Sequence, residues 1–238
     1  VEDDSIDAGD LDSNVITLSG GQFQFQNGNN NSTVGGTFIV TEDSSFDYKN
    51  EDDDDTRTTT FGSLDFVNTT NSNPTLAFVH EGENDDNNGY TAEFTNSTFT
   101  GSGTIDQSLW DGDEYGRVVL NGGSGASNVV ITKISTAIAV DGSTNQQDLE
   151  LNGDWSGFEG TFVVGNGAAS GDLDLRTDMG NGTVKVETGG RLTSLGDLAL
   201  GTLVINDATN SDSPDATGGA FWHNDGTLTV GVLGGDGV

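Results

Sequence analysis

The stretch GTVKVETGGRLTSLGDLALGTLVIND, residues 182–207, contains the phrase GTVKV and, nineteen residues later, the similar phrase GTLVI. Gly-Thr followed by apolar residues also occurs in GTFIV (36), GTFVV (160) and GTLTV (226), with a weaker copy, GTIDQ, at 103. The last four clear phrases begin 22, 19 and 25 residues apart. A repeat of this length predicts a solenoid, in which each coil contributes short strands that stack on those of the next coil.

The rest of the chain carries the same local pattern of alternation. No window keeps apolar residues at helical spacing without an intervening glycine, whereas short segments of period two recur between Gly, Asn and Asp. These segments predict strands of three to six residues. They are QFQFQNG (22–28), GTFIV (36–40), SLDFV (63–67), YTAEF (90–94), GRVVL (116–120), NVVITKI (128–134), DLELNG (148–153) and GDLDL (171–175).

Together these patterns predict an all-β fold, a right-handed parallel β-solenoid of about ten coils with short strands and Gly/Asn/Asp turns. Neighbouring coils would lie about 4.8 Å apart. The solenoid is expected over residues 15–238, after an acidic N-terminal segment, residues 1–14, that is extended or binds a partner. Five apolar residues are expected at equivalent inward positions: Phe38, Phe162, Val184, Leu203 and Leu228.

Composition limits the possible partners. The chain has 39 acidic and 7 basic residues and a net charge of -32, so it lacks the basic clusters that nucleic acid binding requires. It has no cysteine and no apolar run of about 18 residues, which excludes disulfides and a membrane-spanning helix. Most of the acids are Asp, a turn-forming residue, and the richness in small polar residues favours a secreted or cell-surface protein.

Two passages resemble a known family. LELNGDWSGFEGTFVVGNG (149–167) and NDGTLTVGVLGGDG (224–237) are similar to the autotransporter-associated β-strand repeats in passenger regions of large bacterial surface proteins. The resemblance covers about a quarter of the chain. It implies a secreted, right-handed β-helical stalk or adhesin-like surface structure, and it supplies no catalytic residues.

Acidic turns are the candidate metal sites. ENDDNNG offers Asn84, Asp86 and Asn88 at alternate positions before a glycine, as in the first half of a calcium loop, although the twelfth position is Thr95 instead of Glu. DGDEYG places Asp111, Asp113 and Glu114 in one tight loop, and DDDD (52–55) concentrates charge further. No cofactor is predicted to be required. Calcium is the ion that these loops favour, and solvated turns are the alternative.

Catalytic patterns are weak by comparison. His80 and His223 have no ligand-like spacing, and no nucleophile elbow occurs. Asp172, Asp174 and Arg176 alternate along one predicted strand, so they would share its outer face as a solvated ion pair or as part of a sugar-cleaving site.

We therefore predict a non-enzymatic structural subunit of an extracellular appendage, sheath or filament. Its predicted partners are copies of itself and divalent cations, because the strands at a solenoid end offer unpaired backbone groups to another chain. The alternatives are an adhesin stalk segment of a longer surface protein, a carbohydrate-active β-helix enzyme, and a salt-adapted protein of ordinary fold.

Overall fold

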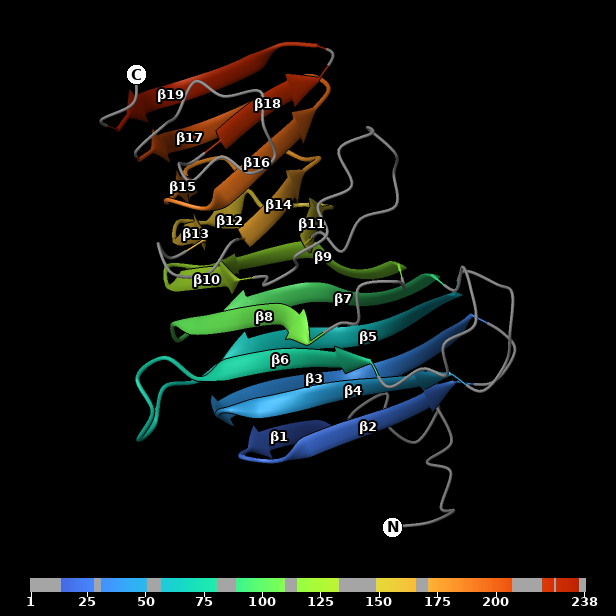
Figure 1. Cartoon of the computed structure of the whole chain (residues 1–238). Helices are drawn as coiled ribbons and strands as arrows, with labels where there is room; N and C mark the ends of the chain where they lie inside the picture. The colour runs from blue at the N-terminus through green and yellow to red at the C-terminus, as the bar shows by residue number, and fades with distance from the viewer. Residues whose placement is uncertain are drawn as a thin grey trace.

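The computed structural model is built of β-strands stacked into two parallel sheets (Figure 1). It describes residues 14–27, 31–50, 57–80, 89–109, 115–132, 149–165, 171–206, 220–224 and 226–235, and no helix occurs among them. The first sheet contains, in spatial order, β1 (Val15–Ser19), β3 (Ser32–Glu42), β5 (Arg57–Phe66), β7 (Gly89–Phe99), β9 (Tyr115–Gly125), β11 (Leu149–Asn152), β14 (Gly171–Leu175), β16 (Gly190–Leu195) and β18 (Ala220–Asn224). The short β12 (Gly157–Phe158) pairs with the end of β9.

The second sheet alternates with the first along the chain. Its spatial order is β2 (Gln22–Asn27), β4 (Ser44–Asn50), β6 (Thr75–His80), β8 (Gly103–Leu109), β10 (Asn128–Thr132), β13 (Thr161–Val164), β15 (Thr183–Val186), β17 (Leu198–Ile205) and β19 (Leu228–Gly234). Each described coil therefore contributes one strand to each sheet, and the described residues form nine stacked levels where about ten were expected. The predicted parallel β-solenoid is confirmed.

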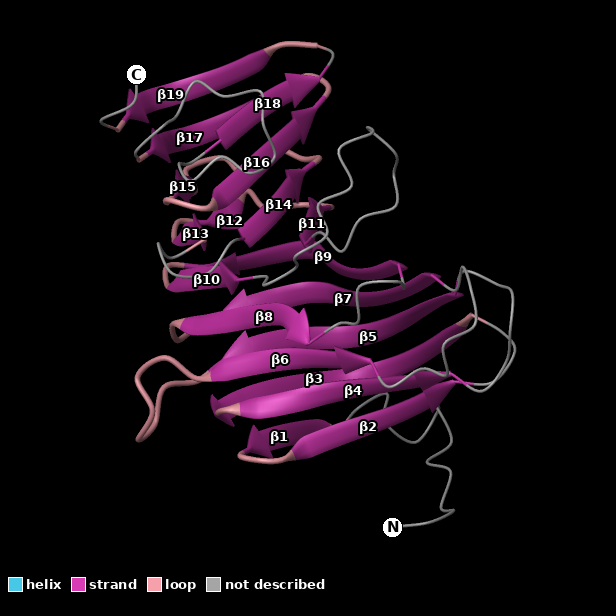
Figure 2. Ribbon diagram, in the orientation of Figure 1, coloured by secondary structure: helices cyan, strands magenta, loops and turns pink. Residues whose placement is uncertain are grey.

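The winding of the coils is visible in the drawing. In the lower half of Figure 1 the second sheet lies in front with its strands running to the right, while the first lies behind with its strands running to the left. Because the chain climbs with every turn, this sense is right-handed. Figure 2 shows that strands make up nearly all of the stacked body.

Strands of the first sheet are longer at the N-terminal end than the sequence indicated. β3, β7 and β9 have 11 residues each, and β5 has 10, because these strands continue around a corner of the coil. At that corner Asn96 and Gly122 have φ angles of 54° and 81°, and Gly153 follows one coil later with 74°. At these three levels a left-handed residue turns the chain without breaking the stack.

Inward side chains form continuous ladders that make up the core. One ladder of the first sheet stacks Val34, Phe61, Phe94, Leu120, Leu151 and Leu175 through six consecutive coils. All six are at most 1% exposed. The N-terminal coils are filled mainly by phenylalanine rings, such as Phe61 and Phe94 with centroids 5.2 Å apart, and the later coils mainly by Leu and Val.

Only some of the Gly-Thr phrases of the sequence occupy equivalent positions in successive coils. Thr161, Thr183 and Thr202 stack directly on one another, and Phe162, Val184 and Leu203 stack beside them, as predicted. Two expectations were wrong. Phe38 lies in the first sheet, not the second, and Leu228 stacks on Leu198, so that Leu233 instead continues the Phe162 ladder. The phrase at 226 is displaced because its glycine sits at a turn, against Gly196 and Asp197.

Candidate functional site: charged ladder, turn caps and stack ends

The predicted calcium ligands Asn84, Asp86, Asn88, Asp111, Asp113 and Glu114 all lie outside the described residues, as does the DDDD run. Within the described ranges, no three His, Cys, Asp or Glu side chains come together in a way that would hold a metal ion. The same part of the chain contains no apolar helix of membrane-spanning length. Calcium binding stays a prediction.

The strongest grouping of charged side chains lies on the outer face of the first sheet. Glu93, Glu150 and Asp174 occupy one outward ladder, with Val119 between the first two. Parallel stacking in register places Glu150 and Asp174 on adjacent strands, where two carboxylates about 4.8 Å apart repel each other. Arginines from two neighbouring positions compensate this repulsion.

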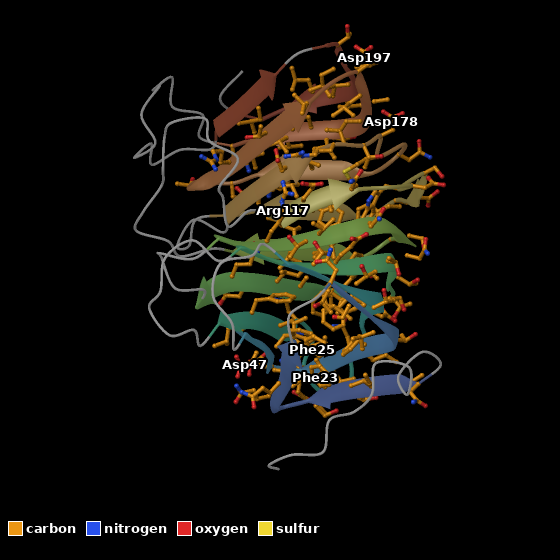
Figure 3. The ribbon with its side chains drawn as sticks, turned by 90° about the vertical axis from the view of Figure 1, so that its right-hand side faces the viewer. Phe23, Phe25, Asp47, Arg117, Asp178 and Asp197 are labelled. Atoms are coloured by element: carbon orange, nitrogen blue, oxygen red, sulfur yellow. The ribbon has the colours of Figure 1, made fainter. Side chains whose placement is uncertain are left out.

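Arg117 and Arg176 bind the same glutamate from opposite sides. Arg117 Nη2 is 2.7 Å from Glu150 Oε2, and Arg176 Nε is 3.2 Å from the same oxygen. Arg176 Nη2 also lies 2.8 Å from Asp174 Oδ2. Charges of alternating sign thus cross β9, β11 and β14, and Figure 3 shows Arg117 about midway along the stack.

This group, Arg117, Glu150, Arg176 and Asp174, is named the charged ladder. Its carboxylates are largely buried, with side-chain exposures of 6% for Glu150 and 13% for Asp174, while both arginines are about one-third exposed. Two guanidinium groups within ion-pair distance compensate the charge of the buried Glu150 carboxylate. The arrangement joins three coils.

The sequence identified half of this group. The predicted Asp174–Arg176 pair is confirmed, and nothing is described for the side chain of Asp172. Glu150 and Arg117 were missed because they belong to other coils. The outer face here is also less solvated than predicted. The similar phrases LEL (149–151) and LDL (173–175) were the sequence signal that would have suggested Glu150 beside Asp174.

Asparagine and aspartate side chains at turns and near strand ends join successive coils. In each case a side-chain Oδ1 accepts a hydrogen bond from a backbone N–H of the following coil. Six such bonds, named here the turn caps, are Asn31 to Thr58 (2.9 Å), Asp43 to Thr75 (2.9 Å), Asp65 to Thr100 (2.8 Å), Asn68 to Ser102 (2.8 Å), Asp178 to Ala199 (2.6 Å) and Asp197 to Thr227 (2.8 Å).

The turn caps give a structural role to some of the Asp and Asn residues of the chain. Where the pairing with the coil below has not begun or has ended, backbone N–H groups lack a strand partner on that side, and a short side chain one coil below reaches them. Asp178 and Asp197, near the upper end in Figure 3, cap the last three coils in this way. Part of the chain's acidity is therefore used within the fold.

The two ends of the stack expose apolar side chains. On β19, Leu233 is 54% exposed, although it stacks on Leu203, which is 2% exposed. At the other end, Phe23 and Phe25 of β2 are only partly buried (Figure 3). β2 and β19 are the two outermost strands of the second sheet.

Comparisons with known proteins found no matching family model, no similar curated protein and no similar solved structure. The resemblance to autotransporter-associated repeats therefore remains a prediction from the sequence.

Proposed function

We propose that this protein is a non-enzymatic structural subunit of an extracellular appendage, sheath or filament, and that it assembles with copies of itself through the ends of its solenoid. The proposal rests mainly on one observation: an inward ladder of core side chains continues to the terminal strand β19, where its last side chain is exposed. Leu233 belongs to the same inward ladder as Phe162, Val184 and Leu203, yet it is the one member that is more than half exposed. Stacking another coil on it would bury apolar surface and pair backbone groups.

The charged ladder supports a structural role over a sugar-cleaving one. In the parallel β-helix enzymes considered above, carboxylates and basic groups would need to face a substrate. Here Arg117 and Arg176 bind Glu150 and Asp174, so their guanidinium groups are engaged within the sheet. Ladders and caps of this kind stabilise a rod, which is what a filament subunit requires.

Net charge shapes the conditions of assembly. A subunit with a net charge of -32 repels its copies, so salt or divalent cations should promote self-association by screening or bridging. The test is the mass and shape of the full chain over a range of concentrations in calcium-containing buffer. Light scattering and negative-stain electron microscopy should show particles longer than one subunit, and a monomer at every concentration would contradict the proposal.

A further inference from the structure

We infer that self-assembly is polar: the end formed by β18 and β19 of one copy stacks on the end formed by β1 and β2 of a second copy. The inference rests on the proposed function and adds its direction. The C-terminal end is defined by Leu228, Val230 and Leu233, and the N-terminal end by the partly buried Ile16, Phe23 and Phe25.

Both ends present a cross-section of the core. At the C-terminal end, Leu228 and Val230 are partly buried and stack on the buried Leu198 and Leu200. At the N-terminal end, Phe23 packs against Phe46 with ring centroids 5.2 Å apart, while its other side has no strand of the described sheets beyond it. The described apolar side chains of β19 are Leu and Val, whereas β1 and β2 supply Ile16 together with the rings of Phe23 and Phe25, so the two surfaces are different.

Strand direction selects which ends meet. Every strand pair in both sheets is parallel, and each coil runs from the first sheet to the second. If β18 and β19 of one copy meet β1 and β2 of another, both sheets continue in parallel through the junction. If two like ends meet, a two-fold axis relates the copies, and the strands across the junction run antiparallel. Only the head-to-tail junction repeats the interface that already joins the coils.

The turn caps, like the strands, have a fixed direction along the stack. In all six, the N–H donor belongs to the later coil and the Asp or Asn acceptor to the earlier one, as for Asp197 and Thr227. Two serine hydroxyls, Ser44 and Ser97, accept in the opposite direction. A head-to-tail junction keeps this order of acceptor and donor from coil to coil, whereas a like-to-like junction places the same kind of group on both sides.

The test uses one blocked end at a time. Leu233→Asp places a carboxylate at the C-terminal end, and Ile16→Asp places one at the N-terminal end. Leu195→Asp is the matched control, because Leu195 is a similarly exposed apolar residue (44%) at the last position of β16, in a level that β18 already follows. Each variant is compared with the wild type by far-UV circular dichroism, thermal melting and light scattering, and Val15→Asp (Val15 is 63% exposed) replaces Ile16→Asp if the latter unfolds.

A polar filament predicts a distinctive result on mixing. Each end-blocked variant alone should stay monomeric, Leu195→Asp should assemble like the wild type, and an equal mixture of the two end-blocked variants should double in mass and grow no further. The doubling follows because each mixed pair has one intact junction. Dimers of a single blocked variant would overturn the polarity but not self-assembly. If the wild-type protein stays monomeric, that result would instead contradict the proposed function, self-assembly, on which the inference rests.

Discussion

Asp197 Oδ1 accepts a hydrogen bond of 2.8 Å from the backbone N–H of Thr227, thirty residues later and one coil higher. The carboxylate supplies an acceptor at a turn, where the strand ladder offers none. The same relationship recurs at Asp178 and Ala199 with a distance of 2.6 Å. These bonds make the turns part of the stack.

Removing this cap should loosen the last described coil. Asp197→Ala should lower the free energy of unfolding by about 1 kcal/mol, the usual value of a side-chain cap on backbone N–H groups. Asp197→Asn is the matched control, because the amide oxygen retains the acceptor. Amide hydrogen exchange at Thr227 should accelerate in the alanine variant only, and equal exchange in both variants would contradict the assignment.

A glycine in the first sheet should tolerate no side chain. A Cβ on Gly62 would lie 1.7 Å from the carbonyl oxygen of Gly36 on the adjacent strand, so Gly62→Ala must separate two coils. We expect a loss of about 3 kcal/mol or more, or failure to fold. Gly21→Ala is the control, because its Cβ would meet nothing within 4 Å. Urea unfolding followed by circular dichroism measures both, and comparable stability of the two variants would disprove the close approach.

The charged ladder should behave as a coupled group. Arg117→Ala leaves Glu150 buried with one arginine partner fewer, which should cost about 1–2 kcal/mol after allowance for the one-third exposure of Arg117. The cost should shrink when Glu150→Gln is also present, giving a coupling energy in a double-mutant cycle. Lys185→Ala, which removes the more exposed Lys185–Glu187 pair, should change stability by less than about 0.5 kcal/mol. Strictly additive effects of the first two changes would argue against the ladder.

Two aspartates should make contributions to folding stability that change with pH in opposite directions. Burial raises the pKa of Asp65 above its ordinary 3.8, against the opposing hydrogen bonds from Thr100. Its folded form therefore takes up a proton at higher pH than its unfolded form, and wild-type protein should gain stability relative to Asp65→Asn as the pH falls from neutral through the raised pKa.

Asp154 supplies the opposite case. Hydrogen bonds from Ser156 lower its pKa below 3.8, so its contribution is present above that value and is lost as the pH falls through the lowered pKa. Wild-type protein should therefore lose stability relative to Asp154→Asn in acid. Denaturation midpoints measured for the three proteins across the acidic range give both signs, and parallel curves would refute the assignment of opposite shifts.

Calcium should raise thermal stability if the predicted acidic loops bind it. Replacing Asp111, Asp113 and Glu114 by their amides should reduce the increase in melting temperature that millimolar calcium produces, since a ligand bound only to the folded state stabilises it by mass action. Changing Asp3, Asp4 and Asp7 to Asn removes the same number of charges from the N-terminal segment and serves as the control. Identical melting with calcium and with chelator would leave these loops as solvated turns.

The sequence by itself determined the class of fold. Alternation of apolar residues, glycines at turns and the repeated Gly-Thr phrases at 160, 182 and 201 can be read in the sequence, and each predicted strand overlaps a strand of the structure. Strands can be recognised from neighbouring residues alone, because successive side chains point to opposite faces of a sheet and apolar and polar residues therefore alternate.

Only the tertiary structure decided which residues meet across coils. Nineteen residues separate stacked Leu175 and Ser194, whereas 33 separate stacked Phe61 and Phe94. Turn length varies without altering the local strand pattern, so the sequence showed neither that Leu228 would stack on Leu198 nor that Glu150 would lie between Arg117 and Arg176. The register is fixed by the requirement that apolar ladders stay inside, and that condition is satisfied only when all the coils are stacked.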